Sequence, residues 1–214
     1  MNIKIFKLLV FIGICVHLVA CGQAGSDYNT GNIKVLPLQV ERQPNRLAQA
    51  AESIIDPKIV YDPSYFSIPY PNGDVPKEKG VCTDVVIRSL RKLGLDLQKE
   101  IHQDMTKNFG AYPNIWGATT TDKNIDHRRV PNQMKYFDRK GYALNITQNP
   151  KDYQPGDIVS WKLNNGLLHI GIISNKKEPK AAHFLIVHNI GGGQILEDVL
   201  FKWDIIGHYR LNKN

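Results

Sequence analysis

The order of periodicities along the chain constrains its fold more than any other feature of the sequence. Between Arg46 and about residue 140, apolar residues recur at helical spacing, as in VCTDVVIRSLRKLG. Later, DIVSWKL and LLHIGIIS are typical of strands and flank NNG, a strong hairpin signal. HFLIVHNI and IIGHYRL predict two more strands. Helices followed by strands predict an α+β fold, with N-terminal helices packed on a C-terminal antiparallel sheet.

Four segments of the first region predict helices. RLAQAAESII predicts one that stops before Asp56–Pro57, because the residue before a proline avoids helical angles. A second helix ends at Gly94, and its buried face is expected to carry Val85, Val86, Leu90 and Leu93. Apolar spacing from Leu97 predicts a third helix, and Pro131 fits the first position of a fourth.

The first 20 residues predict a secretory signal peptide. A basic start precedes an apolar run, Leu8 to Ala20, that is too short to span a bilayer comfortably. The run ends in Leu-Val-Ala-Cys, which resembles the lipobox of bacterial lipoproteins and implies cleavage before Cys21 and lipidation of its sulfur. We expect residues 21–45 to form a polar tether and residues 46–214 to form one folded domain.

This resemblance implies a protein of the bacterial cell envelope, attached to the membrane through lipidated Cys21. Gly22 stands where an aspartate might direct retention at the inner membrane, which favours the periplasmic face of the outer membrane. The formal net charge is +7, and removal of Lys4 and Lys7 leaves +5. No basic run accompanies this charge, so we expect no nucleic acid partner, and we expect a monomer.

Cys82 is the one thiol expected to remain free. Cys15 leaves with the signal and Cys21 carries lipid, so Cys82 has no partner for a disulfide. It lies at the predicted start of a helix, where unpaired N–H groups and the helix dipole favour a thiolate and can hold an oxyanion. Thr83 and Asp84 are also ordinary capping residues there, so a buried structural cysteine stays open as the alternative.

A cysteine nucleophile needs a base that is distant in sequence and near in space. His169 is the first candidate, because it follows the hairpin turn at the start of a strand, with Gly171 allowing close approach of the helix. A structural histidine remains the alternative for this position.

The motifs around these residues resemble a known superfamily. GVCTDVVIRSLRKLG, YQPGDIVSWKL, LLHIGIIS and LIVHNIG together resemble the NlpC/p60 superfamily of papain-like cell-wall hydrolases. The longer strings YPNGDVP, YPNIWG and NIDHRRVPN resemble domain of unknown function 1287, a family within that superfamily. The resemblance implies that Cys82 is the nucleophile and His169 the base, with His188, or else Asn189, as the third member. The sequence departs from the superfamily directly after Cys82, where Thr83-Asp84 stands in place of the frequent Ser-Gly pair.

The segment NIDHRRVPN is dense in charge and suggests a substrate clamp made of Asp126, His127, Arg128 and Arg129, because arginine pairs with carboxylates through two hydrogen bonds. The alternative is a salt-bridged loop that caps the helix from Pro131. His127 is also a second choice for the base. Asp84 is a cap, a substrate contact or a partner of the catalytic groups.

The sequence therefore predicts a cysteine peptidase or amidase that cleaves an amide bond in peptidoglycan stem peptides or a related envelope substrate. The alternatives are a non-catalytic envelope-binding lipoprotein on the same fold and a thiol acyltransferase or amidase with another substrate. The cysteine and the histidines lack the paired short spacings of zinc sites, so we expect no metal and no cofactor.

Overall fold

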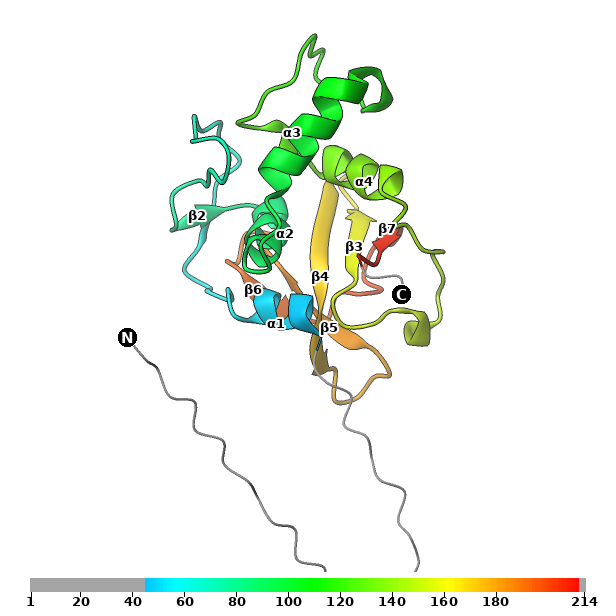
Figure 1. Cartoon of the computed structure of the whole chain (residues 1–214). Coiled ribbons are helices and arrows are strands. Elements are labelled where there is room, and N and C mark those ends of the chain that lie inside the picture. Colours follow the sequence, from blue (N-terminus) through cyan, green and yellow to red (C-terminus); the bar gives the residue numbers. More distant parts are fainter. Residues whose placement is uncertain (1–44, 212–214) are drawn as a thin grey trace, which may run out of the picture. The chain divides into compact units, whose positions relative to one another are not determined.

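The computed structural model describes residues 45–211, which form an α+β domain of helices and an antiparallel sheet (Figure 1). The predicted signal peptide, lipidated Cys21 and all of the tether except Asn45 lie outside the described residues. Within residues 45–211, no helix has the length and apolar character needed to cross a membrane.

The helices and strands follow the predicted order. The α-helices are α1 (Arg46–Glu52), α2 (Cys82–Arg91), α3 (Leu97–Asn108) and α4 (Val130–Arg139). Short 3-10 helices are η1 (Phe109–Ala111), η2 (Asp126–Arg128) and η3 (Pro150–Asp152). The strands are β1 (Val60–Tyr61), β2 (Lys79–Gly80), β3 (Ile158–Lys162), β4 (Leu168–Lys177), β5 (Phe184–His188), β6 (Ile195–Glu197) and β7 (Asp204–Tyr209). The fold class predicted from the sequence is confirmed.

The main sheet has the strand order β6-β5-β4-β3-β7, with every neighbouring pair antiparallel. The predicted hairpin joins β3 to β4, and Gly166 takes the left-handed conformation that its turn requires, with φ 82°. Strand β6 was not predicted, because three residues are too few to show a period. The parallel pair β1–β2 was also not predicted, since its two strands lie far apart in the sequence.

Alternation along the strands divides the buried residues between two clusters. One cluster joins α2, α3 and α4 to Ile158, Ile170 and Ile172, and Figure 1 shows α2 beside β4 and α3 and α4 near its upper end. The other cluster lies on the opposite face of the sheet and includes Trp161 and Ile173. Because side chains of a strand alternate between its faces, neighbours on β4 belong to different clusters.

Two details of the helices differ from the prediction. Helix α1 ends at Glu52, before Asp56, whose backbone instead pairs with Gln194 in an isolated bridge. The predicted buried face of α2 is wrong at Leu93, which lies beyond the end of the helix and is exposed. Ile87 is buried in its place, because α2 packs against α3 as well as against the sheet.

Candidate active site

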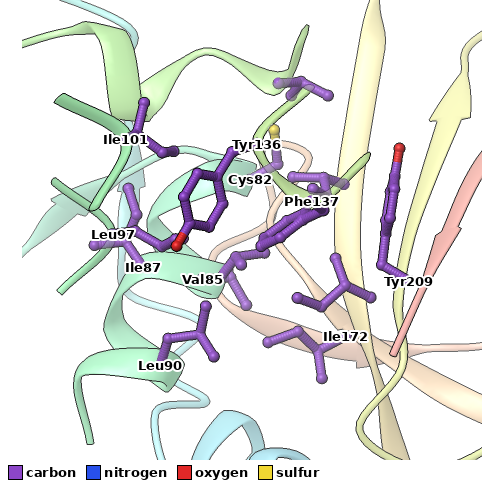
Figure 2. Packing of buried hydrophobic residues seen from close by; sticks show 14 of the residues in the cluster. Cys82, Val85, Ile87, Leu90, Leu97, Ile101, Tyr136, Phe137, Ile172 and Tyr209 are labelled. Carbon is purple, nitrogen blue, oxygen red and sulfur yellow. The ribbon is translucent and has the colours of Figure 1, made fainter. Parts of the chain in front are cut away.

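Cys82 is the first residue of α2. Val81, the residue before it, is extended, and its backbone N–H donates to the carboxylate of Asp84 at 2.7 Å, which closes the start of the helix. Figure 2 shows Cys82 at one end of the helix-facing cluster, with its sulfur directed away from Val85 and Leu90. Only 4% of Cys82 is exposed, so the thiol is covered in this structure.

Burial decides the protonation of Cys82. Loss of water raises the pKa of the thiol to about 12, and the negative charge of Asp84 adds to this effect. The backbone N–H groups of Ile170, Thr83 and Cys82 itself act in the opposite direction, because they point toward the sulfur. The expectation that the helix start favours a thiolate is therefore wrong for the free protein: desolvation outweighs the field of the helix end.

His169 and His188 form a hydrogen-bonded pair on neighbouring strands. Nε2 of His169 lies 2.8 Å from Nδ1 of His188, and Nε2 of His188 lies 3.0 Å from a carboxylate oxygen of Glu197. The carboxylate accepts a hydrogen bond, so Nε2 of His188 carries a proton and its Nδ1 accepts the one on Nε2 of His169. These two hydrogen bonds leave Nδ1 of His169 with a free lone pair, so this nitrogen can accept a proton.

Both imidazoles are neutral near pH 7. Burial lowers the pKa of His169 to about 3, with the neighbouring His188 adding to the shift. Burial also lowers the pKa of His188, against the opposing charge of Glu197. The pair therefore can accept a proton only when a developing negative charge stabilises the imidazolium.

Cys82 contacts β4 beside His169, at Ile170, and not at His169 itself. The sulfur meets the N–H of Ile170, the next residue, whereas the imidazole lies beside Trp161 and Trp203, at ring distances of 5.7 and 5.8 Å. Among the described residues, no hydrogen bond joins the thiol to His169. The expected close approach of the helix to this strand occurs at Ile170 and not at the imidazole, because alternation turns His169 toward the second cluster.

The structure joins His188, and not Asn189, to His169. Asn189 is fully buried, and its amide donates to the carbonyl of Gly80 at 3.2 Å and accepts from the N–H of Gly191 at 3.0 Å. Asn189 therefore holds the strand before Cys82 against the end of β5.

Two residues near these groups were missed in the sequence. Glu197 lies diagonally across the β5–β6 pair from His188, and the glycine-rich turn between the two strands was the available signal. Tyr61 lies opposite Gly80 in the β1–β2 pair, two residues before Cys82, and burial raises the pKa of its phenol to about 12. No local pattern marks Tyr61, because β1 and β2 are far apart in sequence.

Asp84 and Arg128 form a buried ion pair. Nε and Nη2 of Arg128 donate to the two oxygens of Asp84 at 3.0 and 2.9 Å, and both side chains are almost fully buried. Arg128 also donates to the carbonyls of Asp62 and Ser64. Every strong contact of these two groups lies inside the protein, so the geometry favours the structural alternative for both over the substrate clamp.

The other members of the expected clamp have different surroundings, although Nη1 of Arg129 donates to Asp126 at 3.3 Å. Asp126 is buried and accepts the N–H of Asp122 at 2.6 Å. His127 is buried, its Nδ1 lacks a partner among the described residues, and burial lowers its pKa to about 4. Among the described residues, no hydrogen bond joins the imidazole of His127 to Cys82. Arg129 alone is partly exposed.

Within residues 45–211, no group of three or more metal-binding side chains is arranged to hold an ion.

Comparison with known proteins identifies relatives of this domain. Residues 48–211 match the family described as "Domain of unknown function (DUF1287)". The "Uncharacterized protein YijF" of Escherichia coli (strain K12) is 50% identical over 179 residues, which cover 82% of this chain and 87% of that relative. The range matched by the family contains Cys82, His169, His188 and Glu197.

Proposed function

The chain belongs to the family of domain of unknown function DUF1287, and we propose that it is a cysteine hydrolase of the NlpC/p60 type, anchored in the bacterial envelope as a lipoprotein. It cleaves an amide bond in peptidoglycan stem peptides or a related envelope peptide. The observation that carries this proposal is the hydrogen-bonded series His169–His188–Glu197, which leaves a lone pair on Nδ1 of His169, while the next residue of β4, Ile170, contacts Cys82 from the other face of the sheet.

The free protein holds a neutral thiol and a neutral imidazole. As the sulfur attacks the carbonyl carbon, the S–H proton moves to Nδ1 of His169, and an S–C bond forms. The N–H groups of Cys82 and Thr83 at the start of α2 stabilise the oxyanion. The imidazolium then returns its proton to the nitrogen of the breaking C–N bond, and water releases the acyl group and restores the thiol.

The structure holds His169 on the face of the sheet opposite Cys82, against Trp161 and Trp203. This reaction therefore requires the start of β4 to turn the imidazole toward the sulfur, together with a movement of the start of α2. His188 and Glu197 hold the base in the required tautomer throughout.

The experiment is digestion of purified sacculi with the full chain, followed by mass spectrometry of the released fragments. We expect release with the wild type and none with Cys82→Ala. His183→Ala is the matched control, because His183 pairs with Asp198 at the surface and touches none of the reacting groups. Equal release by the wild type and Cys82→Ala would exclude the mechanism.

The cover over Cys82 favours one second candidate, an envelope-binding lipoprotein without catalysis. It predicts retention on sacculi with no fragment release, and the same retention by Cys82→Ala. A thiol acyltransferase or an amidase with another substrate would also leave sacculi intact, but a peptide or lipid panel would then show turnover that depends on Cys82.

A further inference from the structure

A cavity of about 300 Å³ lies between the end of α3 and the start of α4. This volume is at the lower end of the range of small-molecule sites, roughly 300–1,000 Å³. Phe109, Tyr112 and Trp116 supply aromatic walls, and Trp116 is 45% exposed. The cavity therefore offers apolar contact to a ligand of the size of one amino acid residue.

Arg129 brings unused hydrogen-bond donors to this cavity. Its guanidinium carbon lies 4.0 Å from the centre of the Trp116 ring, and Nη1 donates to Asp126 at 3.3 Å. Among the described residues, its Nε and Nη2 make no hydrogen bond. A guanidinium held against an aromatic ring with free N–H groups at its edge is suited to a carboxylate.

Asn132, one helical turn from Arg129, presents an unused acceptor. It lines the cavity and is 1% exposed; its amide donates to the carbonyl of Asp126 at 3.0 Å. Its Oδ1 is buried and has no partner among the described residues. Because buried acceptors are nearly always hydrogen-bonded, an N–H or O–H of a ligand in the cavity would be stabilised by a bond to this oxygen.

We propose that this cavity binds the carboxyl-terminal residue of a peptide. Arg129 pairs with the carboxylate, Oδ1 of Asn132 accepts the amide N–H of the same residue, and the aromatic walls contact its side chain. A carboxylate and an amide N–H are attached to one α-carbon in such a residue, which matches donors and an acceptor three positions apart. A neutral sugar would satisfy Asn132 but would offer no second anion to Nε and Nη2 of Arg129.

The same segment connects the cavity to the thiol. The carbonyl of Arg128 accepts from the hydroxyl of Thr83 at 2.9 Å, and Gln133 donates to the carbonyl of Thr83 at 3.3 Å. A peptide bound in the cavity is therefore held at a fixed place relative to the residue beside Cys82. In this respect the inference rests on the proposed function, since the bound peptide is the substrate whose amide Cys82 attacks.

The experiment compares N-acetyl-leucine with N-acetyl-leucinamide, which differs by the loss of the carboxylate. Binding to the full chain is followed by tryptophan fluorescence and by the NMR signals of the Asn132 side-chain amide. We expect the acid to bind about tenfold more tightly than the amide, the effect of one charge-assisted hydrogen-bond pair. We expect Arg129→Gln to remove this preference, and Cys82→Ala to keep it.

Equal binding of acid and amide, binding of neither, or a preference that survives Arg129→Gln would overturn the proposal. So would stronger shifts of the same signals by N-acetylglucosamine than by the acid. The comparison of acid with amide uses the wild type, so it remains decisive even where the variant does not fold. Because sacculus digestion is not measured, failure of this inference and failure of the proposed hydrolysis are observed separately.

Discussion

Nε2 of His169 and Nδ1 of His188 lie 2.8 Å apart, so one proton is shared between these two nitrogens. Which nitrogen carries it is decided by a third group, because Glu197 requires the proton of His188 on Nε2. The carboxylate thus fixes the tautomers of both rings and leaves a lone pair on Nδ1 of the buried His169. It does so although 43% of its side chain is exposed.

Loss of Glu197 should weaken catalysis without unfolding the protein. We expect Glu197→Ala to lower kcat/KM about tenfold on the peptide substrate found by sacculus digestion. This factor corresponds to a loss of about 1.4 kcal/mol of transition-state stabilisation. Glu197→Gln should lose less, because its amide oxygen still accepts from Nε2 of His188. Thermal melting should show the same midpoint for both variants, and unchanged kcat/KM in Glu197→Ala would contradict the role of this carboxylate.

Acid should destabilise the protein through its buried neutral histidines. The pKa of His127 is lowered to about 4 and that of His169 to about 3, so the unfolded chain binds their protons first as the pH falls below about 6.5. The free energy of unfolding should therefore decrease between pH 6.5 and 4. Urea titrations across this range should show a smaller decrease in His127→Gln. An equal pH dependence in that variant would show that His127 is not among the groups responsible.

Alkali should also destabilise the protein, because the pKa of Cys82 is raised in the folded state, whereas those of the two histidines are lowered. Burial raises the pKa of Cys82 to about 12, so the folded state holds the thiol proton more tightly than the unfolded state does. The corresponding stability is present below the unfolded pKa of about 8.5 and is lost as the pH rises toward 12. Cys82→Ala should unfold with a smaller dependence on pH above 8.5 than the wild type. Alkylation of the wild-type thiol at pH 7 should be slow.

The buried ion pair between Asp84 and Arg128 should be essential to folding. Arg128→Met leaves the carboxylate of Asp84 unpaired in the interior, which is expected to cost about 3–5 kcal/mol. Arg129→Met, at the neighbouring but partly exposed position, is the control and should cost under about 1 kcal/mol. Urea unfolding measures both, and similar losses in the two variants would contradict the structural role of Arg128.

Gly171 should tolerate no side chain. A Cβ there would lie 2.8 Å from the side chain of Ile186 and 3.1 Å from Cβ of His188. Gly171→Ala is expected to destabilise by about 1–3 kcal/mol through overpacking and to shift His188 from His169, with loss of activity. Gly110→Ala, which would meet nothing within 4 Å, should retain stability. Normal activity of Gly171→Ala would show that the close contact is not needed.

Much of the fold was predictable because its signals are local. The NNG turn, Gly94 and the spacing from Leu97 each act within one element, and the structure shows the β3–β4 hairpin and α3 where these patterns place them. The first helix stops before Asp56 as predicted but ends three residues earlier than the predicted segment, and the predicted burial of Leu93 is wrong, because both depend on contacts with distant segments.

The sequence by itself determined which residue types are present for chemistry: one thiol in the predicted mature chain, histidines on two successive strands, and a charged segment before α4. Only the tertiary structure decided how they are used. It paired Asp84 with Arg128, left Arg129 with free donors, and joined Glu197 to His188. It also buried Cys82, so that desolvation reversed the effect expected from its helix position. Hydrogen bonding and desolvation depend on neighbours in space, and a helix or strand pattern specifies only neighbours along the chain.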